Sequence, residues 1–140
     1  MLKTIPRSFT PDLLWLMMSM GHGEELLISD GNFPARTTGN TSIPKIYLPV
    51  QDIATLLSDI FRFFPLDETT TTPLIVMETA KESGVYEQYQ RIADAEGIGK
   101  TIGTLERYDF YRRAGSVAGI VITASTVRGG NIILKKGVVF

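Results

Sequence analysis

Residues 117–140, VAGIVITASTVRGGNIILKKGVVF, contain two apolar runs separated by a short polar segment. The runs at 117–124 and 131–140 predict strands, and STVRGG between them predicts a loop. Neighbouring parallel strands need a crossover of a dozen or more residues, so a loop this short indicates that the two strands run in opposite directions. The rest of the chain alternates strands with helices, and we therefore expect a mixed sheet.

Upstream of these strands, helical and strand patterns alternate along the chain. Apolar spacing and capping residues predict helices at about 11–20, 53–64, 85–95 and 107–114. Short β-rich runs predict strands at 26–29, 45–50, 74–78 and 101–106, with Pro49 favouring a sheet edge for the second. The alternation predicts an α/β fold, a single three-layer domain over residues 1–140 with a mixed sheet flanked by helices.

The first predicted helix is apolar around nearly its whole circumference. Thr10, Pro11 and Asp12 form a helix start, since Thr caps free amides, Pro suits the first turn and Asp favours the positive end of the helix dipole. The run LLWLMM at 13–18 then leaves almost no polar face. We expect one side of this helix to pack on the core and another on a second subunit, which predicts a homo-oligomer.

Charge and hydropathy exclude several classes of partner. The net charge is −1 and the Lys and Arg residues are scattered, so no basic stripe indicates nucleic acid or anionic lipid. The longest apolar run is far shorter than the roughly 20 residues that span a bilayer, and the first residues lack the layout of a signal peptide. We therefore expect a cytoplasmic protein that does not span a membrane.

The inventory of reactive side chains is short. The chain has no cysteine and a single histidine, His22, which removes thiolate chemistry and leaves no basis for a zinc site built from Cys or His. We expect no metal. The chemistry is then left to carboxylates, phenols, Arg, amides and that one imidazole.

His22 lies in GHGEELLISD, residues 21–30, between two glycines that leave the imidazole uncrowded. An imidazole both takes and gives a proton near neutral pH, although a histidine near a helix end also serves to hydrogen-bond a backbone carbonyl. Asp30 is predicted at a strand end before a Gly-Asn turn, where it could contact a ligand or only cap the turn. Their spacing alone does not show that the two side chains meet.

Two further segments offer polar groups for a ligand. Arg107 opens RYDFYRRA, where it could bind a ligand or form local ion pairs on an exposed helix. In RGGN, residues 128–131, the paired glycines let backbone amides approach a ligand and Asn131 offers both a donor and an acceptor. The same turn could be no more than a tight connection, but neutral groups of this kind at strand ends suit a sugar.

Six segments together resemble the fucose mutarotase branch of the family that also contains the D-ribose pyranases. They are MLKTI, PDLL, MGHGEELLISDGNFPA, RYDFYRRA, IVIT and GNIILKKGV, and they cover both ends and most of the chain. The resemblance implies an α/β isomerase that interconverts the α and β anomers of L-fucose or a related monosaccharide, with no metal and no redox cofactor. It also implies ring-shaped homo-oligomers, often decameric, with sites near subunit contacts.

The resemblance also assigns roles to single residues. His22 matches the catalytic histidine, a general acid/base, while Asp30 and Arg107 match sugar-contacting residues. Asp30 would orient the imidazole or hold a sugar hydroxyl, and Arg107 would donate to ring or hydroxyl oxygens. Gly130 and Asn131 match the last two residues of a closing Tyr-Gly-Asn segment, in which Asn131 would fix the rotation of the sugar.

One departure from the family pattern concerns that closing segment, whose Tyr is here Gly129. Tyr108, Tyr111 or a neighbouring subunit then supplies the phenol, or the activity is reduced. We also hypothesise that Phe33 packs against the methyl group of a 6-deoxy sugar. Two alternatives stay open: a non-catalytic monosaccharide-binding partner of a sugar transporter or kinase, and a D-ribose pyranase.

Overall fold

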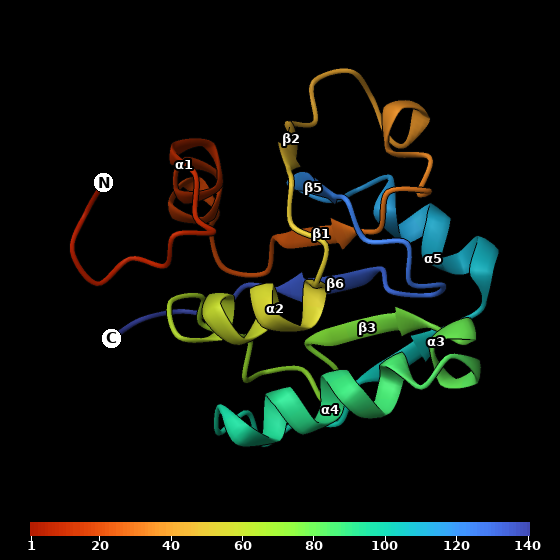
Figure 1. The fold of residues 1–140 in the computed structure, drawn as a ribbon. Coiled ribbons are helices and arrows are strands. Elements are labelled where there is room, and N and C mark those ends of the chain that lie inside the picture. The colour runs from red at the N-terminus through yellow and green to blue at the C-terminus, as the bar shows by residue number, and fades with distance from the viewer.

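A single six-stranded sheet forms the centre of the computed structural model, which describes all residues 1–140 (Figure 1). Its strand order is β2-β5-β1-β6-β3-β4. The strands are β1 (Glu25–Ser29), β2 (Lys45–Leu48), β3 (Leu74–Met77), β4 (Gly103–Leu105), β5 (Gly119–Thr123) and β6 (Ile132–Lys135). The helices are α1 (Pro11–Ser19), α2 (Ile53–Phe61), α3 (Thr79–Glu82), α4 (Val85–Ala95) and α5 (Arg107–Ala114), with a short 3-10 helix at Ala35–Thr37.

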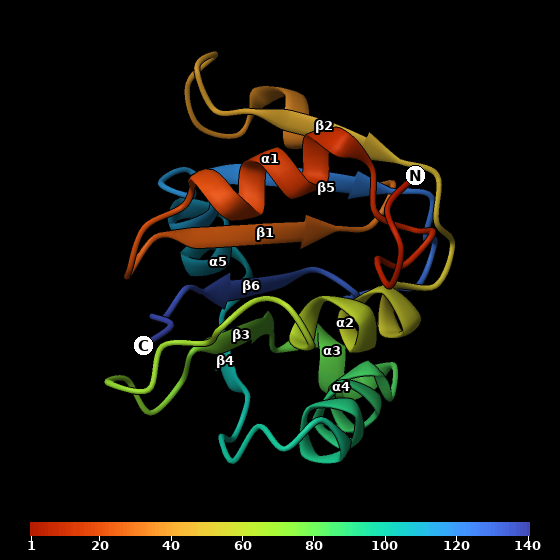
Figure 2. The same ribbon diagram turned by 90° about the vertical axis from the view of Figure 1, so that its left-hand side faces the viewer.

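Helices cover both faces of the sheet. In Figure 2, α1 and α2 lie in front of the sheet and α5 lies behind it. Strand β1 is buried on both faces, since Leu26 and Ile28 belong to the core under α1, α2 and α4, and Leu27 packs with Phe110 of α5. Successive side chains of a strand point to opposite faces, so a strand covered on both sides is a continuous apolar run. The predicted three-layer α/β fold is confirmed.

Strand β6 alone runs against its neighbours. β1, β2, β3, β4 and β5 pair in parallel wherever they are adjacent, whereas β6 pairs antiparallel with β1 and β3, as the arrows of Figure 1 show. The mixed sheet is therefore confirmed, but β5 and β6 do not pair because β1 lies between them. Residues 124–131 cross the end of β1, where the Gly31 amide donates to the Ser125 carbonyl over 2.8 Å.

Element boundaries agree best where a cap or a periodic face is strong. The helices at 85–95 and 107–114 begin and end at the predicted residues, and β2 lies at the sheet edge, as Pro49 indicates. The four-residue helix α3 has no counterpart in the prediction, because it is too short to show helical periodicity. None of the helices is long and apolar enough to cross a membrane.

Helix α1 presents apolar side chains to the core and to solvent. Leu13, Leu16 and Met17 are buried, while Trp15 is 61% and Met18 83% exposed. The outward face predicted from the run LLWLMM therefore exists and is uncovered in a single chain.

Candidate active site

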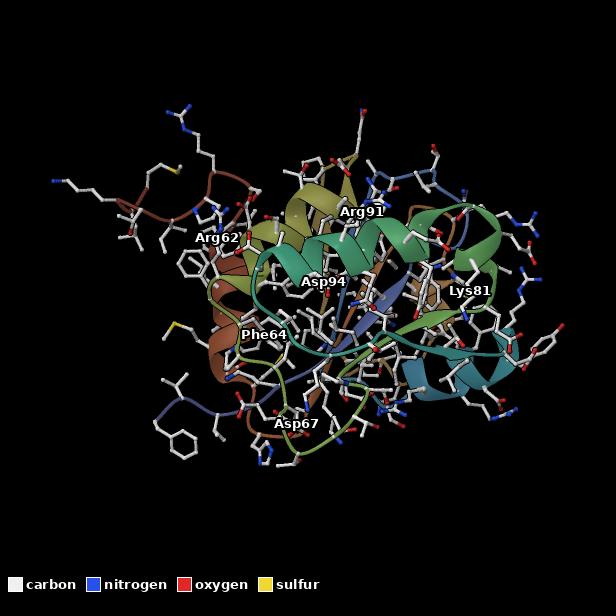
Figure 3. The ribbon with its side chains drawn as sticks, turned by 90° about the horizontal axis from the view of Figure 1, so that it is seen from below. Arg62, Phe64, Asp67, Lys81, Arg91 and Asp94 are labelled. Carbon is white, nitrogen blue, oxygen red and sulfur yellow. The ribbon has the colours of Figure 1, made fainter.

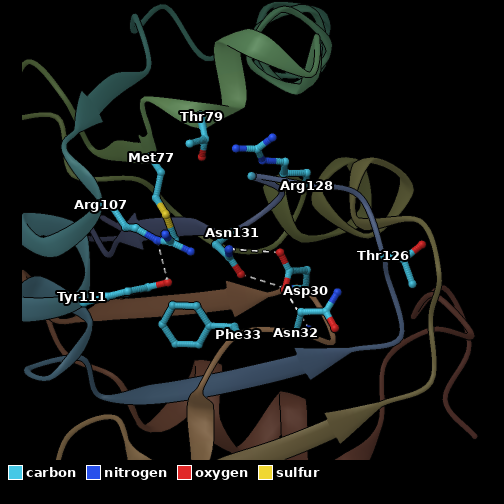
Figure 4. A pocket seen from close by; sticks show the side chains of 11 residues that line it. Asp30, Asn32, Phe33, Met77, Thr79, Arg107, Tyr111, Thr126, Arg128 and Asn131 are labelled. Atoms are coloured by element: carbon cyan, nitrogen blue, oxygen red, sulfur yellow. Dashed lines mark hydrogen bonds between the residues drawn. The ribbon is translucent and has the colours of Figure 1, made fainter.

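A pocket of about 210 Å³ opens at the sheet edge where β1, β3 and β5 end and β6 begins. Ligands of open α/β sheets bind at the carboxyl ends of parallel strands, and reversal of β6 brings its first residue to the same edge. Helix α5 also begins there, after β4. Figure 4 shows the lining residues, which are Asp30, Asn32, Phe33, Met77, Thr79, Arg107, Tyr111, Thr126, Arg128, Gly129 and Asn131.

Asp30 and Asn131 form a reciprocal hydrogen-bonded pair. The Asp30 amide donates to Oδ1 of Asn131 over 2.8 Å, and Nδ2 of Asn131 donates to Oδ2 of Asp30 over 3.1 Å. The Asn32 amide donates to the other carboxylate oxygen over 2.9 Å. Both side chains are buried, yet each carboxylate oxygen can accept a further bond and Asn131 keeps one N–H free. The pair can therefore bind a ligand hydroxyl as donor or as acceptor.

Arg107 projects from the first turn of α5 beside Tyr111, one helical turn further on. Its Nε donates to the Tyr111 hydroxyl over 3.3 Å, and this hydrogen bond is the main cause of a raised pKa of Arg107. The guanidinium contacts a phenol rather than a carboxylate, so the local ion pair that the sequence left open does not form. The guanidinium of Arg107 lines the pocket and has N–H groups beyond the one bonded to Tyr111, and these can donate to a ligand.

An apolar wall, made of Phe33, Met77 and the ring of Tyr111, completes the pocket. Phe33 and Tyr111 meet edge to face, with ring centroids 5.6 Å apart. Phe33 and Met77 are buried, with 7% and 5% of their surface exposed, so packing in the core holds both side chains in position. The pocket thus combines directional polar groups with one apolar side. Tyr108 is 64% exposed and lies outside it.

Gly130 does not line the pocket, although its neighbours Gly129 and Asn131 do. Its carbonyl accepts a hydrogen bond of 2.8 Å from the hydroxyl of buried Tyr89. Burial raises the pKa of Tyr89, and the charges of Asp52 and Asp30 raise it further, so the phenol stays a neutral donor. Gly130 therefore affects the pocket through its backbone: the hydrogen bond from Tyr89 holds the peptide that precedes Asn131 in place.

His22 lies at the opposite end of β1 from Asp30, with a five-residue strand between them. At about 3.3 Å per residue this strand separates the two positions by roughly 16 Å. Nε2 of His22 lies 3.3 Å from Oδ1 of Asp67, and the imidazole is 49% exposed. Hydrogen bonds from Thr69 lower the pKa of Asp67 to about 2, so the carboxylate is ionised. Figure 3 shows Asp67 well apart from Lys81, which lies two residues after the pocket residue Thr79 in α3.

Within one chain, therefore, Asp30 does not contact the imidazole, and the carboxylate beside His22 is that of Asp67. Of the predicted residues, the fold brings together Asp30, Arg107 and Asn131 and leaves His22 and Gly130 outside the pocket. No group of three or more His, Cys, Asp or Glu side chains is placed to hold a metal ion.

Several lining residues were not predicted: Asn32, Met77, Thr79, Thr126 and Arg128. All lie within a few residues of the end of β1, β3 or β5. Their common signal is this position, because the carboxyl ends of parallel strands share one edge of a sheet. The residue types alone carry no such signal.

Fold and pocket define a small α/β protein with a polar ligand site at the carboxyl ends of its parallel strands. The chain belongs to the RbsD / FucU transport protein family, which it matches over residues 3–139. The fucose mutarotase of Mus musculus is 36% identical over 143 residues, which cover 97% of this chain and 94% of the relative. The L-fucose mutarotase of Histophilus somni (strain 2336) is 36% identical over 143 residues, with 99% and 97% covered.

A solved structure of similar fold is the fucose mutarotase from Streptococcus pneumoniae in complex with L-fucose. It superposes with a TM-score of 0.91 at 36% identity and covers 99% of this chain and 100% of its own. The family resemblance drawn from the sequence is confirmed.

Proposed function

We propose that this chain is an isomerase, a sugar mutarotase that interconverts the α and β anomers of L-fucose. The observation that carries the proposal is its match, over 99% of the chain, to a fucose mutarotase structure that holds L-fucose. The pocket of about 210 Å³ is smaller than the roughly 300–1,000 Å³ of sites for drug-sized ligands, which suits a monosaccharide. Residues 1–140 then act as one mutarotase domain.

The pocket offers a contact for each kind of group on the sugar. Asp30 and Asn131 bind adjacent hydroxyls, because both residues line the pocket and their mutual bonds leave lone pairs and one N–H unused. Arg107 donates to a ring or hydroxyl oxygen. Phe33 on the apolar wall packs against the 6-methyl group, which predicts that L-fucose is turned over faster than its 6-hydroxy analogue, L-galactose.

Mutarotation requires two proton movements and no change of oxidation state. A base removes the proton of the anomeric hydroxyl, the bond between the anomeric carbon and the ring oxygen breaks, and an acid protonates that oxygen. The open aldehyde rotates and closes on its other face by the reverse steps. General acid/base catalysis of this kind is worth about 10²- to 10⁴-fold, and the reaction balances without metal or redox cofactor.

His22 is the proposed general acid/base, and it reaches the sugar from a neighbouring copy of the chain. This arrangement reconciles an exposed imidazole at one end of β1 with a pocket at the other end. An apolar surface suited to a second copy is present, since α1 exposes Trp15 and Met18. We propose a cytoplasmic homo-oligomer, and a ring of ten subunits is the form that the family resemblance favours.

Magnetisation-transfer NMR on equilibrated L-fucose tests the activity, because a catalyst exchanges the two anomeric signals and a binding protein does not. We expect exchange with the wild-type chain and a steep loss with His22→Gln, while both unfold at similar urea concentrations. Unchanged exchange in the variant means that the imidazole is structural. Binding without exchange favours the transporter or kinase partner, and faster exchange of D-ribose favours the pyranase.

A mixing experiment tests whether His22 acts between subunits. His22→Gln and Arg107→Met chains, each inactive alone, are unfolded together and refolded into mixed oligomers. If each site combines residues of two copies, about a quarter of the sites regain both wild-type side chains. No recovery, in oligomers shown to be mixed, would place His22 in the site of its own chain or outside catalysis.

A further inference from the structure

Helix α3 brings to the pocket a hydroxyl group that the proposed mechanism does not use. Thr79, the first residue of α3, is half-buried and lines the pocket. Figure 4 shows its side chain directed toward the space above Arg107 and Asn131, and none of the hydrogen bonds drawn there involves it. The hydroxyl is therefore free to donate and to accept on the side of the pocket opposite Asp30.

The backbone on both sides of Thr79 is held in place. The amide of Glu78 donates to the Leu105 carbonyl over 2.9 Å, which ties the end of β3 to the end of β4. Ala80 is fully buried in the larger core. These anchors hold the backbone of Thr79, and its β-branched side chain has few χ1 rotamers, so little freedom is lost when a ligand binds it.

Gly129 sets how closely the turn before β6 approaches α3. Its φ is +76°, a conformation that favours glycine, and an added Cβ would lie 2.9 Å from the Ala80 nitrogen and 3.0 Å from the Thr79 carbonyl carbon. These neighbours are backbone atoms, which cannot rotate away. A side chain at position 129 therefore has to displace the start of α3, and Thr79 with it.

We propose that the Thr79 hydroxyl binds the 2-, 3- or 4-hydroxyl of the sugar substrate and that Gly129 is the residue that positions it. The inference rests on the proposed function and adds a specificity-determining contact to it. The sugar is then held from the β1–β6 side by Asp30 and Asn131 and from the α3 side by Thr79. At this side of the pocket Thr79 supplies a hydroxyl in place of the phenol that is absent at position 129.

The test compares Thr79→Val, which removes the hydroxyl at nearly constant shape, with Thr79→Ser, which keeps it. Thr101→Val is the matched control, because Thr101 is exposed and lies outside the pocket. Anomer exchange is measured on L-fucose and on its 2-, 3- and 4-deoxy analogues. Loss of one neutral hydrogen bond predicts an about three- to tenfold higher KM of Thr79→Val for L-fucose, with Thr79→Ser and Thr101→Val close to wild type.

The deoxy analogues distinguish a direct contact from a general disturbance. For the analogue that lacks the bound hydroxyl, wild type and Thr79→Val should have the same KM, since neither can form the bond. For the other two analogues the about three- to tenfold difference should persist. Gly129→Ala should raise the KM for L-fucose as well, and the double variant should add little to either single one.

Two results would overturn the inference: a Thr79→Val variant with wild-type KM, or one whose KM rises equally for every analogue. If the wild-type chain binds L-fucose without exchanging its anomers, the mutarotase proposal fails, and Kd values for the same four sugars decide the role of Thr79. If it neither binds nor exchanges L-fucose, both proposals fail together.

Discussion

Replacing Asn131 by Asp tests the central pair of the pocket most directly, because the change keeps the shape and reverses one hydrogen bond. Oδ1 can still accept from the Asp30 amide, but an oxygen replaces the Nδ2 that donates to Asp30 over 3.1 Å. Two carboxylates at that separation repel by roughly 5 kcal/mol at an effective dielectric constant near 20. This is a large part of the about 5–15 kcal/mol that stabilises a typical domain.

One of the two carboxyl groups therefore stays protonated, which removes the charge repulsion and lets it donate a hydrogen bond to the other. The native Asn131→Asp variant then binds more protons than its unfolded chain. Its stability relative to wild type therefore falls as the pH rises and recovers as the pH is lowered. Anomer exchange should be weak at pH 8, where the second charge and the lost donor both disturb the sugar contacts.

Urea unfolding of wild type and variant between pH 4 and pH 8 measures this directly. Asn40→Asp is the control, because Asn40 is exposed and its Oδ1 accepts from the Ser42 amide, a bond that Asp can also accept. We expect the free energy of unfolding of Asn131→Asp to lie well below that of wild type at pH 8, and this difference to narrow toward pH 4. For the control we expect almost no difference at either pH. A gap independent of pH, or one as small as that of the control, would refute the buried pairing of Asp30 and residue 131.

Three other substitutions test the framework of the site. Tyr89→Phe leaves the buried Gly130 carbonyl without its donor, so unfolding in urea should show a loss of about 1–3 kcal/mol and anomer exchange should weaken. Hydrogen bonds from Thr69 hold the pKa of Asp67 at about 2, below the ordinary value of 3.8. The stability that this carboxylate contributes is therefore present above about pH 4 and lost as the pH falls toward 2. Acid unfolding of the Asp67→Asn variant should lack this pH dependence. Leu13→Ala, at a fully buried position of α1, should cost about 2–5 kcal/mol in urea unfolding.

Much of the fold can be read from local patterns. The helix at 107–114 is bounded by Glu106, whose carboxylate accepts from the amides of Tyr108 and Asp109, and the helix at 85–95 is followed by Gly97 in a left-handed conformation. Such signals act over a few residues. The pairing of strands depends instead on residues far apart in the sequence. The predicted antiparallel direction of β5 and β6 is correct, although the two strands are not neighbours in the sheet.

The site likewise has features that local sequence patterns predict and features that depend on the arrangement of the strands. Local sequence patterns alone indicate that Asp30 and Asn131 stand at strand ends, that Arg107 opens a helix, and that the chain carries a single imidazole. The contact between Asp30 and Asn131, and that between His22 and Asp67, depend on which strands are neighbours and in which direction they run, so local patterns do not predict them. Capping and periodicity are short-range effects within one segment, whereas the pocket is an edge shared by segments up to 101 residues apart.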